Sequence, residues 1–201
     1  MFVLFSFACN RTHYPLSRLR VPTESVQVLG ADILQTKEPE KTFQMLREHI
    51  AAVRRIHSLL QYSTVRIILE RNLGFEAEHL YRECKGIENS RFVCEPSNVT
   101  RIGVLTTQER KLGFVTYTNV LLRENRVFAH DLDWVEVHSN DTRKVLLDQL
   151  SFFGFTFMRP ENSFQKEKFA ISGKSAGGKD DLCMALLIGM YFAIDDRFIL
   201  V

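Results

Sequence analysis

Apolar and polar residues alternate in segments that fit β-strands and amphipathic helices in turn. Residues 26–34 form a mostly apolar run that predicts a strand. A long helix is expected to follow from Pro39, because proline suits the first turn of a helix, with Thr36 as a candidate cap. Its apolar positions step by three and four, which places on one face Phe43, Leu46, Ile50, Val53, Ile56 and Leu60.

The same patterns continue to the end of the chain. Strands are predicted at residues 1–9, 65–69, 91–94 and 127–130, and residues 155–158 are expected to be extended. Helices are predicted at residues 75–84, from Thr107 through Leu122, from Asn140 or Asp141 to near Phe153, and at residues 181–193, the last apolar on nearly every side. This alternation indicates an α/β architecture, and residues 1–201 are interpreted as a single domain because no repeat or linker interrupts them.

The composition is that of an ordinary globular protein. The chain has 201 residues, of which 45% are hydrophobic and 25% charged, and its formal net charge is +2. This charge is too small to indicate nucleic acid binding by itself. A basic segment nevertheless leads into an acidic pair, and it holds Arg159, Lys166, Lys168, Lys174 and Lys179 against Glu161 and Glu167. Basic loops beside carboxylates suit a polyanion held over a metal site, and an ordinary solvated loop is the alternative.

Targeting and cysteine patterns favour a soluble, intracellular protein. Residues 1–9 are apolar but lack a basic n-region, so a core strand is preferred over a short signal peptide. No run approaches the roughly 18 apolar residues that a membrane span needs. The four cysteines are widely spaced, include no C-x-x-C pair and are interpreted as reduced: Cys9, Cys84, Cys94 and Cys183.

Other short patterns do not make convincing sites. Gly173-Lys174-Ser175 resembles the end of a phosphate-binding loop, but Lys168 stands where that motif needs glycine, and no adequate apolar strand is expected before it. Nucleotide binding is therefore not expected. His130, Asp131 and Asp133 are better explained as turn residues than as a second metal site. No serine or cysteine lies in a nucleophile-elbow pattern.

Two adjacent carboxylates, Asp180 and Asp181, follow a glycine pair and stand at the start of the last apolar helix. Neighbouring like charges repel, which favours a cation that neutralises them. Acids at a helix N-terminus also cap the first amides and suit the positive end of the helix dipole. Both interpretations stay open for this pair alone.

A third acid, Glu70, ends the apolar run at residues 65–69. Open α/β sheets place their chemistry at the carboxyl ends of strands. An isolated glutamate there is more often a capping or loop residue, but together with Asp180 and Asp181 it makes a metal site competitive. Hard oxygen ligands on separate elements suit Mg²⁺ or Mn²⁺.

Four segments follow one another in a distinctive order. Residues 69–74 (LERNLG) hold a strand-terminal acid followed by asparagine and glycine. Residues 103–111 form a threonine- and lysine-bearing stretch, residues 127–131 with 147–150 space a strand and a helix, and residues 172–186 (SGKSAGGKDDLCMAL) lead through glycines into the acidic pair. Together they resemble the nuclease domain of the large terminase subunit of herpesviruses and tailed phages. The most specific match, residues 172–186, is similar above all to the herpesvirus version.

The resemblance implies an RNase H-like fold, in which a mixed five-stranded sheet has helices on both faces. It also implies a metal-dependent endonuclease that cleaves concatemeric double-stranded viral DNA during genome packaging, in the host nucleus for the herpesvirus type. Its partners would be DNA, other terminase subunits and the portal, with no membrane and no nucleotide. Two divalent ions, Mg²⁺ or Mn²⁺, would activate water and stabilise the leaving oxygen of a phosphodiester.

The resemblance also assigns roles to individual residues. Glu70 and Asp181 would be metal ligands, and Asp180 would either share that role or orient it. Lys174 and Lys179, in the basic segment that also holds Lys166 and Lys168, would hold the DNA backbone rather than read bases.

The chain departs from the family at its beginning. Such nucleases usually carry another catalytic aspartate on a first strand, but no acid precedes Glu24, and residues 1–8 match the family's second strand. The first strand, its aspartate and the packaging ATPase are therefore expected to be missing, as in one exon, a truncated product or a degenerate copy. Asp32, on the following strand, is a poor substitute that the sequence does not exclude. Three functions stay open: an endonuclease domain, a catalytically impaired DNA-binding or assembly module, and another RNase H-like enzyme such as a junction resolvase or transposase.

Overall fold

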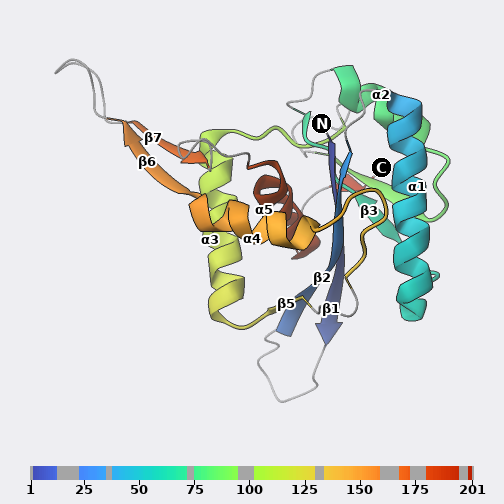
Figure 1. Cartoon of the computed structure of the whole chain (residues 1–201), viewed down its shortest axis with the longest axis horizontal. Coiled ribbons are helices and arrows are strands. Elements are labelled where there is room, and N and C mark those ends of the chain that lie inside the picture. Colours follow the sequence, from blue (N-terminus) through green and yellow to red (C-terminus); the bar gives the residue numbers. More distant parts are fainter. Residues whose placement is uncertain are drawn as a thin grey trace.

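Two small mixed sheets form the middle of the molecule, with helices on either side (Figure 1). The structure, a computed structural model, describes residues 2–12, 23–34, 38–71, 75–94, 102–129, 134–158, 168–172, 180–194 and 199–200. Its strands are β1 (Phe2–Thr12), β2 (Thr23–Leu34), β3 (Val65–Ile67), β4 (Ser90–Cys94), β5 (Val127–Ala129), β6 (Gly154–Met158), β7 (Lys168–Ser172) and β8 (Ile199–Leu200). Its helices are α1 (Pro39–Ile56), the 3₁₀ turn η1 (Ser58–Leu60), α2 (Phe75–Cys84), α3 (Gln108–Arg123), α4 (Thr142–Phe152) and α5 (Asp181–Ile194).

The strands pair in both directions. In the first sheet, β2 lies between β1, which is antiparallel to it, and β5, which is parallel to it. In the second sheet, β4 lies between the parallel β3 and the antiparallel β8. The predicted α/β class is therefore confirmed. Among the described residues, however, hydrogen bonding divides these strands between two three-stranded sheets and does not join five of them in one.

One hydrophobic layer lies between α1, α2 and the second sheet. Leu46 of α1 packs with Ile67 of β3 and Phe92 of β4, and Cys84 at the end of α2 completes this cluster. The face predicted from the apolar spacing of α1 is confirmed in part. Phe43, Leu46 and Ile50 make these contacts, whereas Val53 and Leu60 pack in a neighbouring cluster with Leu29. Ile56 is 48% exposed at the end of the helix, and Leu60 lies in η1 rather than in α1. The N-cap position of α1 is Glu38, and the expected cap Thr36 lies outside the described residues.

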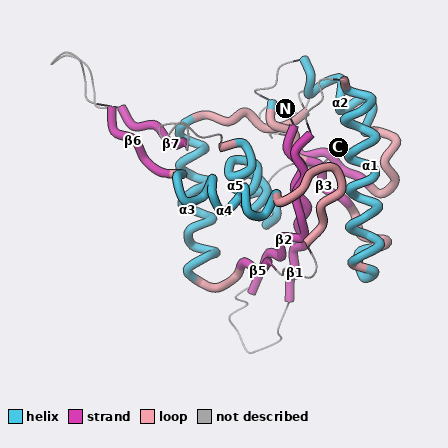
Figure 2. Tube along the Cα trace, viewed as in Figure 1, coloured by secondary structure: helices cyan, strands magenta, loops and turns pink. Residues whose placement is uncertain are grey.

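The second layer is built around α5, which α3 and α4 flank (Figure 2). Leu182, Met190 and Phe192 of α5 are each at most 2% exposed, as expected for a helix that is apolar on nearly every side. Phe114 of α3 packs against Phe192 with ring centroids 6.0 Å apart. The predicted cap of α3 is confirmed, because the Thr107 hydroxyl accepts a hydrogen bond from the Arg110 amide at 3.2 Å.

A β-hairpin of β6 and β7 projects from the body of the molecule (Figure 1). The predicted extended segment at residues 155–158 is its first strand. The second strand, Lys168–Ser172, was not predicted, and it corrects the expectation that no adequate strand precedes Gly173. The objection that Lys168 replaces a required glycine still excludes a phosphate-binding loop.

The described residues can be compared with the predictions about membrane spans and cysteines. Among the helices described, none combines the length and apolar character that crossing a bilayer requires. Cys84, Cys94 and Cys183 are buried free thiols, in agreement with the prediction for these three residues.

Candidate functional site

Glu70 lies just beyond β3, where the backbone is held by Val104. The Val104 amide donates to the Leu69 carbonyl at 2.8 Å, and the Arg71 amide donates to the Val104 carbonyl at 2.8 Å. These two bonds form a parallel bridge between Glu70 and Val104. The Glu70 side chain is half-buried, so its position is fixed by backbone bonds while it keeps access to solvent.

Gly103 allows this bridge to form. Its amide donates to the Val93 carbonyl at 3.1 Å, so residues 102–104 are bonded to β4 on one side and to the extension of β3 on the other. The φ angle of Gly103 is +91°, and a Cβ atom there would lie 2.6 Å from the Leu69 carbonyl oxygen. Glycine is therefore required beside Glu70, both for the backbone conformation and for the close approach.

The acidic pair lies at the N-terminus of α5, as predicted. Asp180 is at the N-cap position, where its carbonyl accepts a 2.8 Å hydrogen bond from the Met184 amide. Its side chain is 3% exposed, whereas Asp181 is half-buried. The Cys183 amide donates to the side-chain oxygen of Gln149 in α4 at 3.1 Å. Because an N-cap side chain bonds the second or third amide of its helix, Gln149 takes one of the two amides open to a capping aspartate.

The thiol beside this pair is neutral. Burial raises the pKa of Cys183 to about 12, and the nearby charge of Asp180 adds to the rise. At neutral pH the thiol is therefore protonated and adds no negative charge next to the two carboxylates.

One hydrophobic cluster joins the two acid-bearing elements. It contains Val104, the bridge partner of Glu70, together with Cys183 and Met184 of the first turn of α5, and Ile68 packs against it. The carboxyl end of the β3 segment and the start of α5 are thus built on the same core. Within the described part of the chain, no group of three His, Cys, Asp or Glu side chains lies close enough to hold a metal ion.

The structure leaves the predicted basic residues untested. Lys166, Lys174 and Lys179 lie outside the described residues, and of Lys168 only the backbone is described, as the first residue of β7. The turn residues His130, Asp131 and Asp133 also lie outside them. Contact of the lysines with DNA stays a prediction.

Asp32 of β2 is a structural anchor. Its side chain is fully buried, and Oδ2 lies 2.6 Å from Nδ1 of His49 in α1. Oδ1 accepts hydrogen bonds from the His138 amide at 2.8 Å, the Ser139 amide at 3.1 Å and the Ser139 hydroxyl at 2.9 Å. Burial alone raises the pKa of Asp32, but hydrogen bonds from His49 and from the His138 and Val137 amides outweigh it and lower the pKa to about 2. With both oxygens occupied, Asp32 is not available as a replacement metal ligand.

Sequence reasoning did not predict the supporting roles of two residues in this region, Asp32 and Gln149. These roles depend on partners that are distant in the chain: Asp32 bonds His49, 17 positions away, and residues 105 to 107 positions away, and Gln149 reaches 34 positions. The only sequence signal for Asp32 is an acid inside an apolar strand run, which indicates a buried and paired carboxylate.

Comparison with known proteins supports the fold. No family model matches this chain, and no curated protein matches it in sequence. The structure is similar to the nuclease domain of human cytomegalovirus terminase, with a TM-score of 0.58 and 15% identity over 88% of this chain and 75% of that one. For the Mn-soaked form the TM-score is 0.57 with 17% identity over 87% of this chain and 76% of the other. A Mn-soaked, inhibitor-bound form gives a TM-score of 0.50 and 16% identity over 87% and 75%. The resemblance found in the sequence is thus confirmed as a shared fold.

Proposed function

We propose that the chain is a terminase-type nuclease domain with an RNase H-like fold, which hydrolyses phosphodiester bonds of double-stranded DNA with divalent metal ions. The fold likeness to a terminase nuclease domain over 87% of the chain is the observation that carries this proposal. Cleavage of concatemeric viral DNA during packaging, in the host nucleus and together with other terminase subunits and the portal, is the context that we infer from it.

The donor set suits the proposed ions. Glu70 and Asp181 are half-buried carboxylates on separate elements that share one core, and Asp180 stands directly beside Asp181. Carboxylate oxygens are the ligands that Mg²⁺ and Mn²⁺ prefer. The ions supply an activated water and neutralise charge on the leaving oxygen when bound.

The residues of the chain hold and orient these ligands. The Val104 bridge fixes the backbone of Glu70, and the Gln149 side chain fixes the first turn of α5 that carries Asp181. Lys174 and Lys179, with Lys166 and Lys168, are proposed to hold the phosphate backbone of the DNA near the acids.

Cleavage of a supercoiled plasmid in Mn²⁺ or Mg²⁺ tests the proposal. We expect nicking by the wild-type chain that chelation with EDTA stops, and that Glu70→Ala and Asp181→Ala each reduce to background. Glu109→Ala, which removes an exposed acid from the first turn of α3, is the matched control and should cleave normally. Unchanged cleavage in both site variants would overturn the assignment.

A catalytically impaired DNA-binding or assembly module with the same fold is the second candidate function. It is favoured by the observation that no three-ligand cluster exists among the described residues and that Asp32 cannot supply another ligand. Calorimetry separates the two. Absence of heat with millimolar Mn²⁺, with DNA binding retained, would support the impaired module, and a saturable heat that Asp181→Ala removes would support the enzyme.

A further inference from the structure

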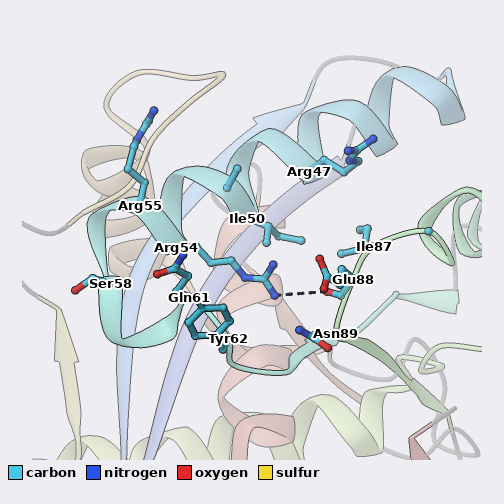
Figure 3. Close-up of a pocket in the computed structure, with 12 residues that line it drawn as sticks. Arg47, Ile50, Arg54, Arg55, Ser58, Gln61, Tyr62, Ile87, Glu88 and Asn89 are labelled. Carbon is cyan, nitrogen blue, oxygen red and sulfur yellow. Dashed lines mark hydrogen bonds between the residues drawn. The ribbon is translucent and has the colours of Figure 1, made fainter.

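A basic groove runs beside the C-terminal half of α1. Its volume is about 820 Å³, and it is bordered on one side by α1 and on the other by residues 86–89, with Gln61 and Tyr62 at its end (Figure 3). These residues precede β3 and β4, so the groove lies at the amino ends of two parallel strands. Glu70 lies beyond the opposite end of β3, about 16 Å further along an extended chain at roughly 3.3 Å per residue. The groove is therefore separate from the candidate metal site.

Three arginines of α1 supply its charge. Arg47 and Arg54 are seven residues apart, which puts them on one face of the helix about 10 Å apart along its axis. Arg55 also lines the groove, at its edge, and its side chain points away from Arg54 and Glu88 (Figure 3). The acid among the lining residues is Glu88, so the net charge of the lining is +2, three arginines less one carboxylate.

The arginine charges are not neutralised by carboxylates of the described residues. The Arg54 guanidinium donates to the main-chain carbonyls of Ser63 at 3.2 Å and Glu88 at 3.5 Å, both of which are uncharged acceptors. Its Nε is buried without a partner in the described part of the chain. Arg47 lies over the ring of Phe43, 5.6 Å from its centroid. These contacts hold Arg54 and Arg47 in place and leave their charge available to a ligand.

The remaining polar lining residues are hydrogen-bond donors of the kind that contact phosphate and sugar: Ser58, Gln61, Tyr62 and Asn89. The side chain of Tyr62 is 83% exposed, so its ring is open to stacking by a base. The isoleucines of the groove, Ile50 and Ile87, already pack in the α1 core. The groove thus offers no apolar cavity for the anchor residue of a peptide, which favours nucleic acid over an acidic protein segment.

We propose that this groove binds the sugar–phosphate backbone of a nucleic acid, as a second contact site apart from the metal centre. The choice of nucleic acid as the polyanion rests in part on the proposed function, whereas the charge and the donors of the groove do not. The groove would hold a strand or duplex arm at a distance from the point of cleavage.

Fluorescence anisotropy in EDTA, where no cleavage occurs, tests this proposal with labelled 20-nucleotide single-stranded and duplex DNA. Arg47→Gln/Arg54→Gln should weaken binding about tenfold or more at moderate salt, because two phosphate contacts are lost. The slope of log K against log salt should become shallower by about 1.4 to 1.8, at 0.7 to 0.9 per contact. Arg47→Gln/Arg55→Gln, which keeps the carbonyl contacts of Arg54, should act in the same direction and guards against misfolding of the first variant.

The matched control is Arg123→Gln/Lys144→Gln, which removes the same charge from exposed positions on α3 and α4. The proposal is overturned if this control loses as much affinity as the groove variants, or if both groove variants bind normally. It is also overturned if polyglutamate of equal charge displaces the DNA as well as unlabelled DNA does, which would identify a protein-binding surface.

Tyr62→Ala distinguishes the two nucleic acid ligands. A loss that is larger for the single strand assigns an unpaired strand to the groove, and an equal small loss assigns the duplex backbone; both support the proposal. Failure of the nuclease proposal remains distinguishable, because cleavage by the wild-type chain in Mn²⁺ is measured separately from binding in EDTA. Groove-dependent binding without any wild-type cleavage would overturn the nuclease proposal alone.

Discussion

At the scale of single residues, Asp32 ties together three distant parts of the chain. Its carboxylate joins β2 to His49 of α1 and to the backbone of residues 137–139. A buried charge is tolerated only when its oxygens are hydrogen-bonded, and here each oxygen has at least two donors. The anchor therefore contributes to stability through charge as well as shape.

We expect Asp32→Asn to lower the free energy of unfolding by about 3 kcal/mol at pH 7, as for other broken buried pairs. The pKa of Asp32 in the folded chain is about 2, below its ordinary value of 3.8. Its stabilisation is therefore complete above the ordinary value and is lost as the pH falls through about 4 towards 2, a change of about 2 kcal/mol. Urea midpoints at pH 7, 4 and 2.5 measure this. Equal acid sensitivity in wild type and variant would contradict the anchor role.

A second residue-scale prediction concerns Gly103. Alanine there meets both the positive φ and the Leu69 carbonyl, so Gly103→Ala should cost about 2 kcal/mol or more. Because the same segment fixes Glu70, any Mn²⁺ affinity should fall with it. Gly113→Ala is the control: a Cβ at Gly113 meets nothing within 4 Å, and alanine in a helix should stabilise by about 0.5 to 1 kcal/mol. Thermal unfolding and calorimetry of both variants give the comparison.

At the scale of elements, the start of α5 depends on α4. Gln149→Ala leaves the Cys183 amide without its partner, and we expect a loss of about 1 kcal/mol in stability and weaker Mn²⁺ binding. Gln149→Glu keeps an acceptor oxygen there and should recover the helix, while its charge alters metal binding. Recovery of neither property by Gln149→Glu would mean that the amide bond is not what positions this turn.

Several elements were predictable because their signals are local. The helix expected at residues 75–84 is α2, and the apolar run at residues 181–193 is α5 with one residue added. The hairpin strand β7 was not predicted, because it has five residues with only two large apolar side chains, Phe169 and Ile171. So short a segment shows no clear alternation, and its strand conformation depends on pairing with β6. Likewise, the division of the strands into two sheets depends on pairing between distant segments, which no local pattern encodes.

The candidate site was predictable only in part for the same reason. The acids stand out by type and by position at element ends, as Glu70 and Asp181 do. The contacts that hold these acids in place do not stand out in the sequence. The Val104 bridge and the Gln149 side chain each come from a segment about 34 residues away. Sequence alone therefore identified the carboxylates and left their supporting contacts to the structure.

At the scale of the whole molecule, the strands separate the two hydrophobic layers, one beside α1 and α2 and the other around α5. Phe92 of β4 packs towards α1 and α2, whereas the next residue, Val93, packs towards α3 and α5. The candidate acids belong to the second core, through Val104 and Cys183. A ligand bound by those acids should therefore stabilise the folded chain as a whole.

We expect Mn²⁺ at ten times its dissociation constant to raise the free energy of unfolding by about 1.4 kcal/mol. Glu70→Ala/Asp181→Ala should abolish this gain, and Glu109→Ala should retain it. Thermal unfolding followed by circular dichroism, with and without the ion, measures the effect without any cleavage assay. The same gain in the double variant would place the ion elsewhere.

Each of the two hydrophobic layers contains a buried, unreactive cysteine. Cys84 lies in the α1 layer and Cys183 in the α5 layer, both are 0% exposed, and burial, with smaller contributions from Glu83 and Asp180, raises the pKa of each to about 12. An alkylating reagent thus meets neither an accessible sulfur nor a thiolate until a layer opens. Isotope-coded alkylation, followed for each cysteine-containing peptide by mass spectrometry, would measure the rate of local opening of the α1 layer and of the α5 layer separately. Equal alkylation rates of Cys84 and Cys183 would mean that the two layers unfold together, and different rates would mean that one layer opens before the other.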